Sequence, residues 1–149
     1  RVKHMPPVPA HCPPKPVLDQ QTLSAVITNR YDVLSHYAGA IRETFADEVR
    51  ALKKASPRDA ERLYKLRHWL FSEERVLLAR ERELLEAALS DSPALLKLLV
   101  MRRELKALWG RSLETSDQLV AKLQDWCRRA EESGIASLAG FARQLRAYA

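Results

Sequence analysis

The stretch ITNRYDVLSHYAGAIRETFADEVRAL, residues 27–52, decides the fold class of this chain. Its apolar residues recur at steps of three, four and seven positions, which places them on one face of an α-helix. The stripe extends back toward Asp19, a residue suited to cap a first turn. At 1.5 Å per residue we expect a helical face about 50 Å long, with a break at Asn29 or Gly39 as the alternative. The stripe consists of Leu23, Ile27, Leu34, Tyr37, Ile41, Phe45, Val49 and Leu52.

Further helix starts and stops follow along the chain. Ser56-Pro57 and Ser92-Pro93 each place a capping hydroxyl before a proline, which is tolerated in the first helical turn. Thr115 or Ser116 is expected to cap another helix, while Gly110 and Gly134 are stop signals. The residues expected to point inward are Leu63, Leu66 and Leu70 after Pro57, then Leu77, Leu78, Leu84, Leu85 and Leu89 in a helix over 72–89, then Leu119, Leu123, Trp126 and Ala130, and finally Leu138, Phe141, Leu145 and Tyr148 after Ser137.

Composition agrees with helices throughout. The chain has 149 residues, of which 46% are hydrophobic and 30% charged, and glycine is scarce at four. Six of the eight prolines fall between Pro6 and Pro16, and proline removes a backbone donor and disfavours helix before it. We therefore predict an all-α bundle of five or six helices over residues 18–149, preceded by an extended proline-rich linker over residues 1–17.

The positive charge permits a nucleic-acid or anionic-lipid partner. The net charge is +6, with +3 in residues 1–16, +2 in residues 91–110, +1 in residues 111–149 and a balance of zero in the rest. Candidate phosphate-contacting residues lie on the polar sides of predicted helices. The alternative is that they form ordinary solvated faces compensated by Glu104, Glu131 and Glu132. The candidates are Arg102, Arg103, Lys106, Arg143 and Arg146, with a further basic pair at Arg128-Arg129.

Familiar catalytic patterns are missing from the sequence. The histidines are scattered, no HExxH or histidine box occurs, and the two cysteines form no CxxC pair, so we expect no metal and no cofactor. The chain has no phosphate-binding glycine loop and no nucleophile elbow. No apolar run approaches the roughly 20 residues that span a bilayer. We expect Cys127 and the tryptophans Trp69, Trp109 and Trp126 to be core residues.

From about residue 26 to residue 148, the sequence resembles part of the DDE-type transposases of bacterial insertion sequences. In VITNRYDV, Tyr31 takes the family's aromatic position and Asn29 the position of a metal-binding aspartate. The resemblance continues through a leucine-rich helix and the LxxLW pattern of residues 105–109 to Trp126, the SGI turn of residues 133–135 and the FAxxLR pattern of residues 141–146. It implies that the other two catalytic carboxylates lie outside this chain. Because an amide is a weaker Mg²⁺ ligand than a carboxylate, Asn29 marks a degenerate metal position.

The beginning of the chain also resembles another kind of protein. VKHMPPVPA followed by LSAVITNRYDVLSHYA looks like the C-terminal extension of bacterial membrane fatty-acid (acyl-CoA) desaturases, which is itself transposase-like. This resemblance implies a parent membrane enzyme whose histidine boxes are absent here. Residues 2–16 would then form the linker that leaves its catalytic part.

From these observations we expect a non-catalytic, cytoplasmic, helical accessory domain, tethered to the inner membrane through a desaturase. Its expected partner is a protein or the parent enzyme, with a homodimer as another option. The alternative is a DNA-binding fragment of a DDE-type transposase, which uses the basic residues named above. Neither interpretation assigns a catalytic residue to this chain.

Overall fold

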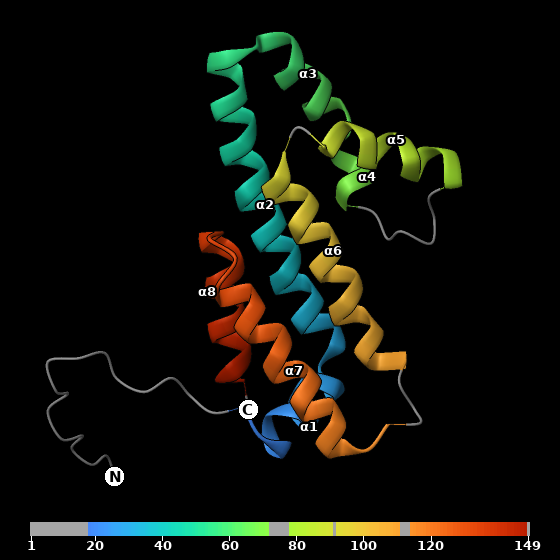
Figure 1. Ribbon diagram of the computed structural model, residues 1–149, viewed down its shortest axis with the longest axis vertical. Helices are drawn as coiled ribbons and strands as arrows, with labels where there is room; N and C mark the ends of the chain where they lie inside the picture. Colours follow the sequence, from blue (N-terminus) through green and yellow to red (C-terminus); the bar gives the residue numbers. More distant parts are fainter. Residues whose placement is uncertain (1–17, 72–77, 91, 111–113, 149) are drawn as a thin grey trace, which may run out of the picture.

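The computed structural model describes residues 18–71, 78–90, 92–110 and 114–148, which form helices joined by short connections (Figure 1). This described part contains eight α-helices and one short 3-10 helix, η2, so the all-α prediction is confirmed and the predicted number of five or six is too low. The proline-rich residues 1–17 lie outside the described residues. In chain order the helices are α1 (Gln20–Thr28), α2 (Arg30–Ala55), α3 (Pro57–Lys65), α4 (Arg67–Phe71), α5 (Ala79–Leu89), α6 (Pro93–Ala107), η2 (Leu108–Gly110), α7 (Ser116–Glu131) and α8 (Ala136–Arg146).

The long helix α2 organises the molecule (Figure 1). Helix α6 runs beside it, the α7–α8 pair packs near its N-terminal half, and α3 folds back on its C-terminal end. Helix α1 lies at the base, against α7. None of the helices in the described part combines the length and the apolar character needed to cross a bilayer.

The break between α1 and α2 falls at Asn29, one of the two expected positions, whereas Gly39 lies within α2. The Asp19 carboxylate caps α1 by accepting from the Thr22 amide at 3.0 Å. Because the helix is interrupted, the predicted stripe is wrong at Ile27, whereas Leu23 is buried as predicted. Ile27 is 40% exposed and Tyr31 86% exposed. Their places in the core are taken by the buried residues Val26 and Val33.

The two serine–proline pairs start helices in different ways. The Ser56 hydroxyl accepts from the Asp59 amide at 3.4 Å, and Pro57 is the first residue of α3, as predicted. Pro93 likewise begins α6, but Ser92 makes no side-chain cap. Its buried hydroxyl instead donates to the Glu48 carboxylate at 2.6 Å, which ties the start of α6 to α2. The capping role predicted for Ser92 is therefore wrong.

The segment between α2 and α6 departs most from expectation. The helix predicted after Pro57 is divided at Leu66, which ends α3 and is half-buried, while Leu63 and Leu70 are buried as expected. Helix α5 begins at Ala79, and residue 77 lies outside the described residues. Leu85 and Leu89 are buried. Leu78 is 69% exposed and Leu84 50% exposed, so their predicted core positions are wrong. A short helix packed mainly on α4 and α6 buries only one narrow side.

The C-terminal helices follow the prediction closely. Thr115 caps α7 by accepting from the Gln118 amide at 3.1 Å, and the Gln118 side chain accepts from the Thr115 amide at 2.8 Å. Gly134 follows α7 with a φ of +80°, a backbone conformation that favours glycine. Helix α8 begins at Ala136, just before the predicted start. The predicted inward residues are buried except Tyr148, which is partly buried: Leu119, Leu123, Trp126, Ala130, Leu138, Phe141 and Leu145.

Three aromatic side chains from α2, α7 and α8 meet in the core. The Tyr37 ring lies 5.0 Å from Phe141 in an edge-to-face arrangement and 6.1 Å from Trp126. Both polar atoms of this cluster donate to backbone carbonyls of α6, Tyr37 Oη to Leu98 at 2.6 Å and Trp126 Nε1 to Met101 at 2.9 Å. The cluster therefore holds four helices at one place, and burial raises the pKa of Tyr37 far above its usual range.

The other residues predicted to lie in the core do so to different degrees. Trp126 and Cys127 are buried, while Trp69 and Trp109 pack partly buried at the edge of the core. Burial raises the pKa of the Cys127 thiol to about 12, which keeps it protonated and unreactive at neutral pH. Cys127 is thus a core residue, as predicted.

We expect Tyr37→Phe to lower the free energy of unfolding by about 1–2 kcal/mol, because the buried Leu98 carbonyl loses a donor. Tyr148→Phe is the matched control, since that hydroxyl bonds to Asp32 at the surface, and it should cost no more than about 0.5 kcal/mol. Urea denaturation followed by circular dichroism measures both. Equal losses in the two variants would contradict the role given to Tyr37.

Candidate nucleic-acid interface

The five basic residues singled out in the sequence lie on α6 and α8 and do not share one surface. Arg102, Arg103 and Lys106 belong to α6, which packs on α2, α5 and α7. Arg143 and Arg146 belong to the last turn of α8, which packs on α2 and α7. Helix α7 lies between these two sites in Figure 1.

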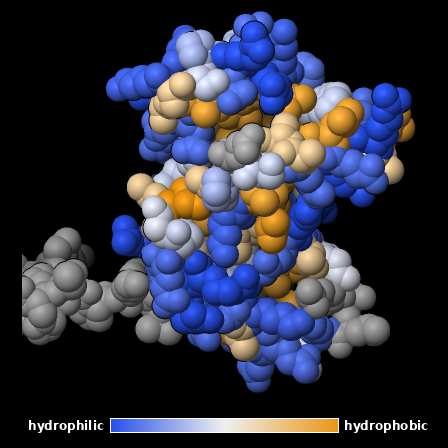
Figure 2. Space-filling view, turned by 45° about the horizontal axis from the view of Figure 1, so that its top comes forward, coloured by the Kyte–Doolittle hydropathy of each residue, from blue (hydrophilic) through white to orange (hydrophobic). Residues whose placement is uncertain are grey.

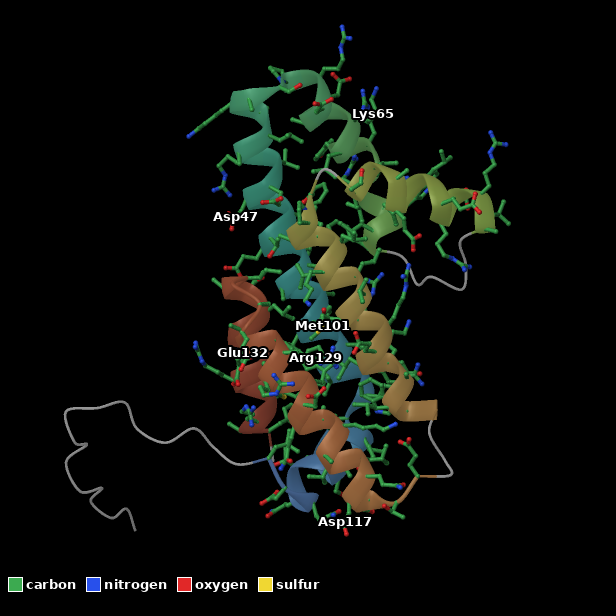
Figure 3. All side chains as sticks on the ribbon, in the orientation of Figure 1. Asp47, Lys65, Met101, Asp117, Arg129 and Glu132 are labelled. Carbon is green, nitrogen blue, oxygen red and sulfur yellow. The ribbon has the colours of Figure 1, made fainter. Side chains whose placement is uncertain are left out.

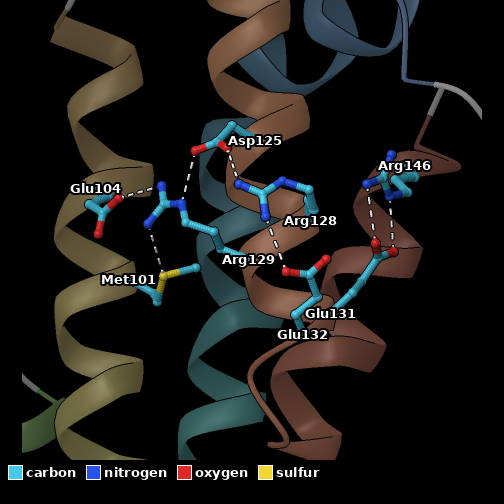
Figure 4. A network of polar contacts seen from close by, with 8 residues as sticks. All are labelled: Met101, Glu104, Asp125, Arg128, Arg129, Glu131, Glu132 and Arg146. Carbon is cyan, nitrogen blue, oxygen red and sulfur yellow. Dashed lines mark hydrogen bonds and ion pairs between the residues drawn. The ribbon is translucent and has the colours of Figure 1, made fainter.

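Two of the five basic residues, both arginines, form ion pairs that join separate helices of the described part. Arg146 donates to both oxygens of Glu131, at 2.9 and 3.1 Å, and the side chains are only 14% and 4% exposed (Figure 4). Arg103 donates to Glu86 of α5 at 2.6 Å. Both bonds join separate helices. These contacts indicate structural roles for Arg146 and Arg103, although phosphate contact by either residue stays a prediction that the structure does not test.

A further network joins α6 to α7 through Arg129 (Figure 4). The Arg129 guanidinium donates to Glu104 at 2.6 Å and to Asp125 at 2.9 Å. Arg128 also donates to Asp125, and to Glu132 at 3.1 Å. Hydrogen bonds from Arg128 and then Arg129 hold the pKa of the Asp125 carboxyl below its usual range. Glu104, Glu131 and Glu132 thus pair with Arg129, Arg146 and Arg128, respectively, whereas the choice between solvated faces and phosphate contact for the other basic residues stays a prediction.

The groove beside this network is a poor place for an anion. It lies between α6 and α7, has a volume of about 350 Å³ and is lined by Leu108 and Trp126 as well as by charged residues. Two of those charged residues are the carboxylates Glu104 and Asp125, whose charge repels a phosphate. Arg129 is engaged by both of them.

Arg102 and Lys106 line a groove of a different character. Its volume is about 220 Å³ and its walls come from α2, α4 and α6. No carboxylate is among its described lining residues, whereas a serine hydroxyl and the exposed ring of Tyr31 are. Both cations are half-buried, and each also has an interaction within the protein. We define the basic groove by its lining residues Tyr31, Leu34, Ser35, Ala38, Phe71, Arg102 and Lys106.

Asn29 lies at the exposed junction of α1 and α2. Its backbone N–H closes the last turn of α1 by donating to the Ala25 carbonyl at 3.0 Å, and its side-chain amide donates to the same carbonyl at 2.9 Å. Within the described ranges, no group of three or more histidine, cysteine, aspartate or glutamate side chains is arranged to hold a metal ion. The assignment of Asn29 as a degenerate metal position stays a prediction that this geometry does not test.

The last turns of α2, the helix α3 and the first residue of α4 carry a concentration of basic residues that the sequence analysis missed. Residues 50–67 contain seven basic and two acidic side chains, a net charge of +5. The acidic residues elsewhere in residues 17–90 cancel this charge when the whole segment is summed. A shorter window would have found it. We call this surface the α2–α3 tip and define it by Arg50, Lys53, Lys54, Arg58, Arg62, Lys65 and Arg67.

Comparison with known proteins gives a matching family and a related protein. Residues 18–149 match a family of DDE transposases of the ISL3 type. The transposase for insertion sequence element IS1001 from Bordetella parapertussis is 29% identical over 125 residues. Those residues make up 83% of this chain and 30% of that relative, so the chain spans less than a third of the curated transposase it matches. No solved structure matches the chain.

These matches favour the transposase alternative over the desaturase interpretation. The family match covers α1 to α8, which includes the SGI turn and the last helix that carried the resemblance. Neither match gives any support to an origin in a desaturase or to a tether at the inner membrane.

We expect Arg146→Gln to lower the free energy of unfolding by about 2 kcal/mol, because it removes the two charged hydrogen bonds that Arg146 donates to the buried Glu131 side chain. Arg143→Gln, at an exposed position of the same turn, should change it by less than about 0.5 kcal/mol. Denaturant titrations of both variants make the comparison. A stable Arg146→Gln protein would contradict the structural role.

Proposed function

Because this chain belongs to a family of DDE transposases, we propose that it is a helical part of a transposase that contacts nucleic acid through the basic groove. The proposal takes up the second of the two sequence interpretations. The chain spans only 30% of the matched relative. Its binding of nucleic acid and the activity of the whole protein are therefore both proposed.

The observation that carries the proposal is the arrangement of Arg102 and Lys106. The two residues are four positions apart on α6, so their side chains emerge from one face of that helix. Both line the groove opposite the Ser35 hydroxyl of α2. Two cations and a hydroxyl donor are groups that bind phosphate oxygens. The exposed ring of Tyr31 at the edge of the groove offers a surface on which a base or sugar can pack.

The proposal assigns the chain a binding role and no metal-binding carboxylate. Support comes from Asn29, to which the resemblance assigns the position of a catalytic aspartate, because its side-chain amide donates to the Ala25 carbonyl at the end of α1. An amide also carries no charge to offset that of Mg²⁺. A protein partner, self-association and a cytoplasmic location stay predictions.

The double variant Arg102→Gln/Lys106→Gln tests the proposal. We expect the affinity for a duplex of about 20 bp to fall, and the slope of log affinity against log salt to decrease in magnitude by about 2, one for each lost phosphate contact. Fluorescence anisotropy at several salt concentrations measures both quantities.

Lys97→Gln provides the control, because Lys97 is exposed on α6 and is not among the lining residues of the basic groove. It should leave the slope within about 1 of the wild-type value. The proposal is wrong if the wild-type chain shows no salt-dependent binding. It is also wrong if the double variant behaves like the control.

A further inference from the structure

The α2–α3 tip presents cations that the fold does not neutralise. Lys53, Lys54 and Arg58 are exposed, and none of them forms an ion pair with another residue in the described ranges. The neighbouring pairs are at the surface and join residues three or four apart, such as Lys65 to Glu61 at 3.2 Å. Exposed pairs of this kind are weak and exchange readily with other anions. Figure 3 shows Lys65 projecting outward from α3 at this end of the molecule.

Helix stability accounts for only part of this charge. Lys53 and Lys54 lie in the last turn of α2, where positive charge is favourable. Arg58 lies in the first turn of α3, where positive charge is unfavourable. A cation at this place therefore lowers helix stability, which points to another use for it.

The tip and the basic groove lie along one side of α2. Ser35, which lines the groove, and Lys53, at the tip, are 18 positions apart, or about five complete turns, and so point in the same direction. Arg42 is seven positions after Ser35, about two turns on, and is exposed between them. It too forms no ion pair with the residues that the structure describes.

The acidic residues of α2 are engaged elsewhere or lie on another side. Asp32 accepts from Tyr148 and Glu48 from Ser92. Asp47 pairs with Arg50 at 3.1 Å. Glu43 lines the groove between α2 and α8. The side of α2 that runs from the basic groove to the tip is therefore positive along its length.

We propose that the α2–α3 tip is a second phosphate-contacting surface, and that it binds the same DNA duplex as the basic groove. This inference rests on the proposed function. At 1.5 Å per residue the two surfaces are about 27 Å apart along α2. That distance corresponds to about 8 bp of B-form DNA at 3.4 Å per base pair. Cations of α6 beside the N-terminal half of α2, Arg42 along it and the tip at its C-terminal end form a row that suits an extended, stiff polyanion.

A membrane surface suits the tip less well. Binding in a lipid interface needs an apolar helix face that inserts beside the cations. In α3, Ala60 and Leu63 are buried against the rest of the protein, and the half-exposed ring of Tyr64 has the Arg67 guanidinium over it at 4.0 Å, so α3 offers no continuous apolar face. The outer surface of the tip is hydrophilic in Figure 2.

The test is the variant Lys53→Gln/Lys54→Gln/Arg58→Gln, compared with Arg80→Gln/Arg82→Gln/Lys97→Gln. The control set also removes three exposed positive charges, from α5 and α6. On a duplex of about 20 bp we expect the tip variant to lower the magnitude of the salt slope by about 3 and the control by no more than about 1. The single variant Arg42→Gln should lower it by about 1.

Duplex length supplies an independent readout. A hairpin with a stem of about 6 bp is roughly 20 Å long and cannot reach both surfaces. The tip variant should therefore lose about two-fold in affinity for this hairpin, because only one of two separate sites is removed. Its affinity for the longer duplex, which contacts both surfaces at once, should fall at least ten-fold. Circular dichroism verifies that the variants keep their helix content.

Other outcomes overturn the inference in distinguishable ways. If the tip variant matches its control on the long duplex while Arg102→Gln/Lys106→Gln weakens binding, only the second surface is wrong. If the wild-type chain binds no DNA, the proposed function fails as well. If phosphatidylserine vesicles bind the wild-type chain but not the tip variant, and DNA binding is the same for both, the tip is a lipid surface. If the same pattern is found with polyglutamate in place of vesicles, the tip binds acidic protein.

Discussion

The position of Tyr37 constrains the rest of the structure. Its ring packs against Phe141 of α8 and Trp126 of α7, and its hydroxyl donates to the Leu98 carbonyl of α6. One side chain of α2 thus fixes the rotation of that helix relative to three others. A ring in this place has little freedom, because it is fully buried and its polar atom needs a partner in the core. The opposite side of α2 is therefore held outward, and that side carries Ser35, Arg42 and Lys53.

Ionic contacts divide these basic residues into two groups. Arg129, Arg146 and Arg103 join helices that are separate in sequence and have carboxylate partners at bonding distance. The cations of the α2–α3 tip have at most short-range surface pairs. The protein has a net charge of +6. The cations without interhelical partners among the described residues indicate where an anionic partner binds, which the net charge alone does not. The division also explains why two prominent arginines of the sequence, Arg103 and Arg146, serve the packing of helices.

Local signals in the sequence were enough to predict the helical class and many helix ends. Asp19, Ser56 and Thr115 cap helices as expected, because the partner of each is three residues away. Features that depend on distant partners could not be predicted. Ser92 bonds to Glu48 across 44 positions instead of capping its own helix. Leu78 and Leu84 have core-like spacing but too little protein around them to be buried. The basic groove could not be predicted, because its walls come from three helices whose relative positions depend on the whole fold. The tip could have been found by summing the charge over a shorter stretch of sequence.

Lysine footprinting tests the central claim, that one side of α2 and the adjoining surface of α6 face nucleic acid. The chain is acetylated with and without a saturating duplex of about 20 bp, and each lysine is followed by mass spectrometry. Lys53, Lys54 and Lys106 should lose reactivity when DNA is bound, while Lys97, which is exposed on α6 outside the basic groove, should keep it. Equal protection of Lys97, or unchanged reactivity at Lys53, Lys54 and Lys106, would contradict the claim.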